Sequence, residues 1–101
     1  MKEIMVREYI DGNMAVSYDD GKKCQEDVAK CLNQEEKVIL NFSDISYVIT
    51  AFLNPIIGDL ILERGNGVMK CIAIKNANET IISKIKQVRD GALMKREDME
   101  E

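Results

Sequence analysis

The sequence predicts a small α/β fold, and three observations lead to that class. Residues 38–42 ("VILNF") form a continuous apolar run, which is typical of a strand inside a sheet. Segments with the apolar periodicity of a helix lie on both sides of this run. Strand-like and helical segments alternate along the chain, and residues 1–101 suit one domain. The predicted order is an N-terminal β-hairpin followed by α-β-α-β-α on a mixed sheet.

The N-terminal segment carries the signals of the hairpin. Residues 3–10 are predicted as its first strand and residues 14–17 as its second. Residues 11–13 ("DGN") lie between them, and Asp-Gly between two strand-like segments is a strong turn signal. The two strands are therefore expected to pair with each other.

The first helix is predicted to begin after Ser17, a residue type that caps helices well. Asp19 and Asp20 then fall in the first turn, where negative charge is favourable. The apolar residues of this helix recur at helical spacing and predict one buried stripe, made of Cys24, Val28, Cys31 and Leu32.

The second half of the chain is predicted to alternate strands and helices. The strand at residues 38–42 is expected to be covered on both faces, and residues 43–47 form a polar corner after it. The central helix follows, and residues 65–67 ("GNG") end it. Residues 68–76 are predicted as a strand parallel to the first, because a helix joins the two.

The last helix is predicted to be capped by Asn76 or Asn78. Residues 95–101 are expected to form a frayed acidic tail. The buried face of the helix is predicted to consist of Ile81, Ile82, Ile85 and Val88.

Local rules allow two starts for the central helix. Asn54-Pro55 offers an N-cap followed by an N1 proline, whereas a start just after Thr50 makes Thr50 the cap. We favour the earlier start, because the residue before a proline resists the α conformation. Burial within the fold is the favoured explanation for the apolar surplus of this helix, and an exposed docking patch is the alternative. The surplus comprises Phe52, Leu53, Ile56, Ile57, Leu60, Ile61 and Leu62.

Composition argues against several function classes. A net charge of −4 and a pI near 4.9 argue against nucleic-acid binding, which needs a basic surface. The sequence contains no His, the commonest proton carrier near neutral pH. It also lacks a Gly-rich phosphate loop and a recognisable set of metal ligands. We therefore expect no enzymatic activity, cofactor or metal.

The three cysteines and the apolar segments bear on location. Cys24, Cys31 and Cys71 match neither a disulfide framework nor a zinc site and are predicted to pack as reduced thiols, which suits the cytoplasm. The N-terminus has no signal-peptide core. Residues 51–62 are too short and too interrupted to span a bilayer, so no membrane association is expected.

The stretch from residue 38 to residue 61 resembles the STAS domains, named for sulfate transporters and anti-sigma factor antagonists. Their pattern is a strand ending in Asp-Leu-Ser, then Asp-Ser-Ser-Gly-Leu at the start of a helix that has a glycine after its first turns. Here residues 41–43 are Asn-Phe-Ser, residues 49–53 are Ile-Thr-Ala-Phe-Leu, and Gly58 lies in the helix. The chain is more similar still to the bacterial STAS-like family, which pairs a strand like "VILDFS" with a helix start like "SSFLNE..IG".

The resemblance implies a non-catalytic regulatory module that binds a protein partner. In anti-sigma factor antagonists, an ATP-binding anti-sigma kinase phosphorylates a hydroxyl at the mouth of the central helix, and the unmodified form binds that kinase. Here Ile49, Ala51 and Phe52 replace the acid, the second hydroxyl and the glycine of the pattern, so Thr50 is the candidate phosphoacceptor. The candidate partner-binding residues are Ser43, Asp44, Thr50, Ala51, Phe52 and Asn54.

A structural alternative remains open for each of these residues. Thr50 is then only a helix cap, worth about 1 kcal/mol, and the chain is a structural subunit or homodimer. Ser43 and Asp44 are then turn residues, and Asn41 hydrogen-bonds the corner loop.

Overall fold

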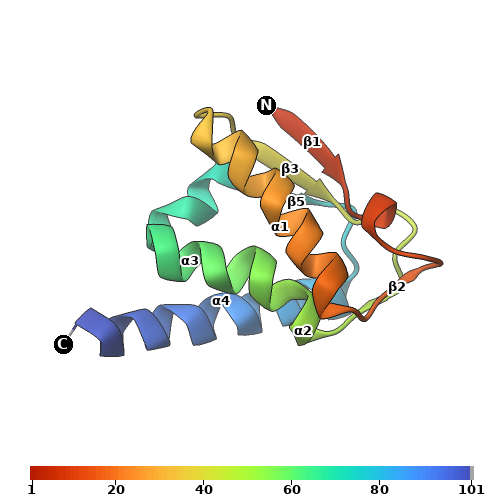
Figure 1. Ribbon diagram of the computed structural model, residues 1–101. Helices are drawn as coiled ribbons and strands as arrows, with labels where there is room; N and C mark the ends of the chain where they lie inside the picture. Colours follow the sequence, from red (N-terminus) through yellow and green to blue (C-terminus); the bar gives the residue numbers. More distant parts are fainter. Residues whose placement is uncertain (101) are drawn as a thin grey trace.

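The computed structural model describes residues 1–100, except for the side chains of residues 66 and 98–100. Short strands and 3-10 turns alternate with longer helices along the chain (Figure 1). In chain order the elements are β1 (Lys2–Met5), η1 (Val6–Tyr9), β2 (Met14–Ala15), α1 (Tyr18–Asn33), β3 (Val38–Asn41), β4 (Tyr47–Val48), α2 (Thr50–Leu53), η2 (Asn54–Gly58), α3 (Asp59–Arg64), η3 (Asn66–Cys71), β5 (Ile72–Lys75) and α4 (Glu79–Glu100).

The main sheet has the order β1-β3-β5, and both of its strand pairs are parallel. The α/β class is confirmed, and so is the parallel pairing of the two strands joined through the central helix. The expected mixed sheet is wrong, because β2 and β4 form a separate pair that is also parallel. The central position of β3 agrees with its apolar sequence.

The predicted N-terminal hairpin is also wrong. After β1 the chain closes a 3-10 turn at Val6–Tyr9 instead of continuing as a strand. β1 then pairs with β3, which sets Ile4 beside Leu40 and buries both. The turn at residues 11–13 exists, with Gly12 at φ 74°, but it leads into β2 and from there to a non-local partner. Burial of the apolar face of β1 against the core outweighs the local turn signal.

Only one face of the main sheet is buried. Ile4, Leu40 and Ile74 are in register on the face that packs against the helices. On the opposite face Glu3 and Ala73 are exposed, and Ile39 between them is partly exposed. The expectation that the strand at residues 38–42 is covered on both faces is therefore wrong, because the helices all pack against the other face.

The central helix is continuous from Thr50 to Arg64 and runs through α2, η2 and α3. The helix thus starts early, as favoured, although it begins at Thr50 itself and one residue before the predicted position. Its middle is a π-helical turn containing Pro55, where the chain accommodates a residue that has no N–H to donate. Gly65, at φ 86°, ends the helix as predicted.

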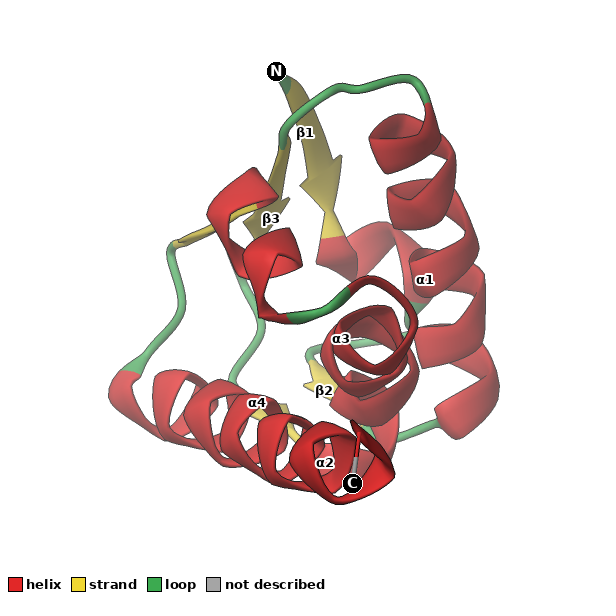
Figure 2. Cartoon of the chain, turned by 90° about the vertical axis from the view of Figure 1, so that its left-hand side faces the viewer, coloured by secondary structure: helices red, strands yellow, loops and turns green. Residues whose placement is uncertain are grey.

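The central helix lies between α1 and α4 (Figures 1 and 2), and this explains its apolar composition. Burial within the fold is confirmed, because its large side chains are fully buried, and the docking-patch alternative is wrong. Leu62 is the partly exposed member of the predicted set. The residues with no exposed surface are Phe52, Leu53, Ile56, Ile57, Leu60 and Ile61.

Helix α1 confirms its predicted cap and most of its buried stripe. The Ser17 side chain accepts a hydrogen bond from the Asp20 N–H at 3.3 Å. Cys24 and Val28 are fully buried, and Cys31 and Leu32 are partly buried against the core.

The C-terminal third differs from prediction in two places. Residues 66–71 form a 3-10 helix, so the strand predicted at 68–76 is confined to Ile72–Lys75. In α4 the Asn78 side chain caps the helix by accepting from the Ile81 N–H at 2.9 Å, as one of the two predicted caps. Ile82, however, is 38% exposed and does not belong to the buried face.

Helix α4 continues to Glu100, and residue 101 lies outside the described residues. The predicted fraying of residues 95–101 therefore stays a prediction. Among the described residues, no helix is both long enough and apolar enough to cross a membrane.

Candidate functional site

The predicted site residues fall into two groups. Ser43 and Asp44 lie in the turn after β3, at the carboxyl end of the main sheet. Thr50, Ala51 and Asn54 lie at the mouth of the central helix, beyond β4. Phe52 has no exposed surface, so its assignment as a partner-contacting residue is wrong. Its ring points into the core because it lies on the helix face that meets α1.

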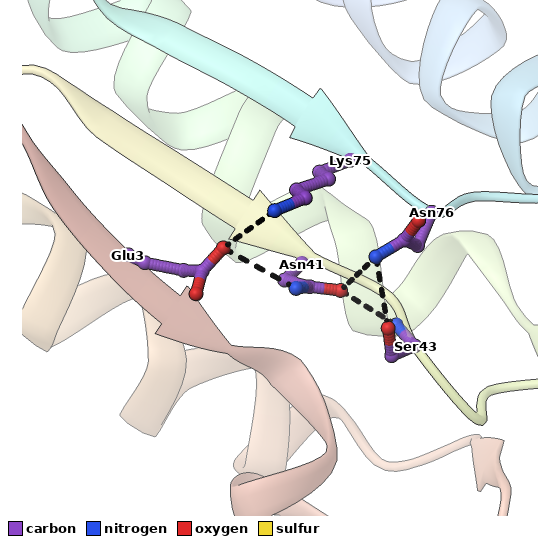
Figure 3. Close-up of polar contacts among 5 residues, drawn as sticks. All are labelled: Glu3, Asn41, Ser43, Lys75 and Asn76. Carbon is purple, nitrogen blue, oxygen red and sulfur yellow. Dashed lines mark hydrogen bonds and ion pairs between the residues drawn. The ribbon is translucent and has the colours of Figure 1, made fainter.

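Asn41 organises the first group (Figure 3). Its Oδ1 accepts from the Ser43 N–H at 2.9 Å and from Asn76 Nδ2 at 3.1 Å. Asn76 Nδ2 also donates to Ser43 Oγ at 2.9 Å. The buried amide of Asn41 therefore holds the corner loop, as predicted, and joins it to the end of β5.

The network continues across the solvent-facing side of the sheet (Figure 3). Asn41 Nδ2 donates to Glu3 Oε2 at 3.3 Å, and Lys75 Nζ lies 3.5 Å from the same oxygen. Glu3 within β1 is thus connected by side chains to the ends of β3 and β5. Such a network of mutual hydrogen bonds stabilises this part of the sheet.

Ser43 and Asp44 behave as the predicted turn residues. Asp44 is at φ 64°, a conformation that Asp tolerates in turns. Its carboxylate pairs with Arg7 of η1, and both side chains are exposed. The turn is therefore connected to η1 as well as to β5.

The mouth of the central helix differs from the capping hypothesis. Ile49 occupies the N-cap position, with extended backbone at φ −107° and ψ 159°, and its carbonyl accepts from the Phe52 N–H at 3.1 Å. Thr50 is the first helical residue, and a side chain at that position does not reach the N–H groups that a cap satisfies. The assignment of Thr50 as helix cap is therefore wrong. Its side chain is partly exposed.

Thr50 opens onto a groove of about 410 Å³ between the central helix and α4, which we call the mouth groove. The groove carries one cation and one carboxylate, from Lys95 and Asp59. Gly58 and Val88 also line it, and a Cβ added at Gly58 would lie 3.5 Å from Val88 Cγ1. The polar and apolar residues that line the groove include Thr50, Asn54, Asp59, Leu62, Gln87 and Lys95.

Four exposed apolar side chains lie in and just after the small β2–β4 sheet, which precedes the helix mouth. Met14 and Tyr47 are register partners in the small β2–β4 sheet and are 51% and 40% exposed. Val16, just after β2, and Tyr18, the first residue of α1, are 48% and 51% exposed. We call these four residues the mouth patch. The sequence analysis missed it because the pairing of β2 with β4 is non-local and the apolar run Met14-Ala15-Val16 does not show which side chains are exposed.

Lys84 of α4 fixes the Tyr47 side of this patch. Its Nζ lies 4.1 Å from the centroid of the Tyr47 ring, a cation–π contact, and donates to the Val48 carbonyl at 2.8 Å. The contact holds the β4 segment, and with it the approach to Thr50, against α4.

The Cys24 thiol and the Tyr9 hydroxyl both have raised pKa values, and both contribute to packing. Burial, reinforced by the charge of Asp27, raises the pKa of the Cys24 thiol to about 12, so this thiol is protonated at neutral pH and a poor nucleophile. Burial and the hydrogen bond that Tyr9 donates to Asp27 also raise the pKa of the Tyr9 hydroxyl. In the part of the chain that the structure describes, no group of three His, Cys, Asp or Glu side chains is arranged to hold a metal ion.

Comparison with protein families gives one match. Residues 20–81 match the model of a STAS-like domain of unknown function (DUF4325), which covers more than half of the chain. The chain belongs to this family. The match runs from the first turn of α1 to the first turn of α4, so it includes Asn41, Ser43, Thr50 and the whole central helix. No curated protein and no solved structure matches the chain.

Proposed function

We propose that this STAS-like domain is a non-catalytic regulatory module that binds a protein partner at the mouth of the central helix. The binding surface consists of Thr50, Ala51 and Asn54 together with the mouth patch. The turn at Ser43 and Asp44 forms its margin. The proposal extends to this chain the role that the resemblance to anti-sigma factor antagonists implies. It includes a cytoplasmic location, which suits the reduced thiols.

The observation that carries the proposal is the position of Thr50. The residues that follow it in the central helix are largely buried, whereas Thr50 is partly exposed at the first helical position and lines a groove. Ile49 fills the capping position, so capping does not explain the hydroxyl. A surface hydroxyl beside an exposed apolar patch suits recognition of a partner, because such patches mark interaction sites on protein surfaces.

Phosphorylation of Thr50 would act as a switch on this surface. A phosphate carries nearly two negative charges and three acceptor oxygens, and the free N–H groups at the start of a helix stabilise it. The same charge disfavours an apolar interface, because it must be desolvated when the partner covers it. An ATP-binding kinase of the anti-sigma type is the partner that this arrangement fits.

The test is a pull-down from host lysate that compares the wild-type chain with Thr50→Ala and Thr50→Glu. We expect one partner to be captured by wild type and by Thr50→Ala, and to be lost with Thr50→Glu, which places negative charge at the helix mouth. Phosphopeptide mapping of the chain isolated from its host is expected to find phosphate on Thr50.

Thr80→Glu is the matched control, because Thr80 is an exposed threonine in the first turn of another helix. The same substitution there is expected to leave capture unchanged. Capture of the partner by Thr50→Glu would show that the interface lies elsewhere. Absence of any partner, together with concentration-dependent sedimentation of the pure chain, would favour the homo-oligomeric role.

A further inference from the structure

A second groove lies on the other side of α4, between this helix and β5. Its volume is about 400 Å³, and it shares no lining residue with the mouth groove. Ile82 is 38% exposed here, and Ile74 of β5 is partly exposed beside it. We call it the β5 groove. The residues that carry the argument are Ile74, Ala77, Ile82, Ile85, Lys86 and Arg89.

The β5 groove runs beside an edge of the main sheet. β5 is the last strand in the order β1-β3-β5. The Lys75 carbonyl accepts from the Phe42 N–H at 2.9 Å and so points toward the β3 side. Backbone groups alternate in direction along a strand, so the N–H and C=O of Ile74 point away from β3. Ile74 therefore offers a side chain to the groove and backbone groups to the sheet edge.

The charge of the β5 groove is positive, in contrast to the net charge of −4 for the chain. Lys86 and Arg89 line it from α4. Arg89 also pairs with Asp90 at 3.0 Å, an exposed contact between sequence neighbours that offsets part of this charge. An apolar floor with cations on one wall is complementary to a segment that carries both apolar and acidic side chains.

We propose that the β5 groove binds an extended acidic segment of a partner protein by strand addition to β5. The segment pairs with the outward backbone groups of Ile74, sets alternate apolar side chains on Ala77 and Ile82, and directs its carboxylates toward Lys86 and Arg89. A second copy of this chain fits poorly, because two-fold pairing of β5 edges would bring the same cations of both copies together. The site is independent of the Thr50 surface, so the domain would bind at two places.

The test uses nuclear magnetic resonance of the full, isotope-labelled chain. The probe is a short blocked peptide of alternating Val and Glu, and its counterpart alternates Val and Lys. We expect the acidic peptide to shift the signals of Ile82 and Ile85 and to slow hydrogen exchange of the Ile74 amide. The basic counterpart is expected to bind at least about tenfold more weakly.

Variants separate this site from the Thr50 surface. Ile82→Glu changes an exposed side chain and is expected to abolish binding of the acidic peptide, and Lys86→Glu is expected to weaken it by about tenfold. Lys30→Glu, the same charge change on an exposed position of α1, and Thr50→Glu are both expected to leave it unchanged.

Three results would overturn the proposal. The two peptides could bind equally well, which would remove the electrostatic argument. The Ile74 amide could exchange at its free rate in the complex, which would exclude strand addition. Finally, the pure chain could self-associate in a way that Ile82→Glu abolishes, which would assign the groove to a second copy.

Discussion

Gly21 lies at a close approach of α1 to the central helix. A Cβ at this position would lie 2.2 Å from the Phe52 carbonyl oxygen, and 3.0 Å from Pro55 Cγ. The near contact is backbone, which cannot move aside as a flexible side chain does. In the sequence Gly21 is only a weak helix former near the start of α1. Its role in helix packing depends on Phe52, about thirty residues away, and so cannot be predicted from the neighbouring sequence.

We predict that Gly21→Ala destabilises the fold by about 2–4 kcal/mol, because the helices must separate to admit the methyl group. Urea unfolding followed by circular dichroism measures the change. Gly91→Ala in α4 is the control, since a Cβ there meets nothing within 4 Å. That variant is expected to be neutral or slightly stabilising, as alanine favours the helix. Equal effects of the two substitutions would contradict the close approach.

Candidate site residues were predictable to different degrees. The role of Asn41 followed from its place at the end of a buried strand, where a polar side chain must find local partners. Phe52 was assigned to the partner surface by the resemblance, whereas its burial depends on packing against α1 and α4, which are distant in the sequence. The capping of Thr50 was predicted wrongly because the helix begins one residue earlier than expected, which puts Ile49 in the cap position. Sequence rules for helix boundaries are less precise than this.

Individual elements were predictable where their signals are local. Ser17 and Asn78 cap their helices, and Gly65 ends the central helix, because capping and left-handed backbone depend on adjacent residues. The N-terminal hairpin was not predictable in the same way. Pairing of β1 with β3 and of β2 with β4 depends on which apolar faces meet in the core. A local turn signal does not carry that information.

Asn78 has a double role in placing α4, and its substitution tests both parts. Its Oδ1 accepts from the Ile81 N–H, and its Nδ2 donates to the Ser46 carbonyl at 3.2 Å. We predict that Asn78→Ala destabilises the fold by about 1–2 kcal/mol, because both hydrogen bonds are lost. Asn78→Asp is expected to have a smaller effect, since a carboxylate still caps the helix and favours its dipole.

Thermal unfolding of the two Asn78 variants distinguishes the cap from the link to the corner loop. If Asn78→Asp is as destabilising as Asn78→Ala, the hydrogen bond to Ser46 outweighs the cap. Stability unchanged in both variants would mean that neither contact matters for the placement of α4.

On the scale of the whole molecule, the two faces of the main sheet have different surroundings. The helices bury one face of the main sheet and leave the other to a polar network, which uses the strand ends for stability. Helix α4 then lines two separate grooves, one with the central helix and one with β5. The two surfaces proposed for protein binding both adjoin α4, while side chains at the carboxyl ends of β3 and β5 hydrogen-bond one another.

The stability of the whole molecule is predicted to fall at alkaline pH. The pKa of the Cys24 thiol is raised from 9.0 to about 12, chiefly by burial, and the pKa of the Tyr9 hydroxyl is raised from 10.0. Above about pH 9 the unfolded chain releases the Cys24 proton while the folded chain keeps it. The stabilisation is thus complete below pH 9 and decreases as the pH rises toward 12. Urea unfolding at a series of pH values measures this decrease.

Cys24→Ala and Tyr9→Phe assign the decrease to these two groups. Each variant removes a group whose proton the folded state retains, so the free energy of unfolding should fall less steeply with pH than in the wild type. Cys31→Ala is the control, because Cys31 is only partly buried on the same helix. If neither Cys24→Ala nor Tyr9→Phe changes the slope of the free energy of unfolding against pH, the alkaline sensitivity arises from other groups. It would also contradict the argument that burial keeps the Cys24 thiol protonated and unreactive.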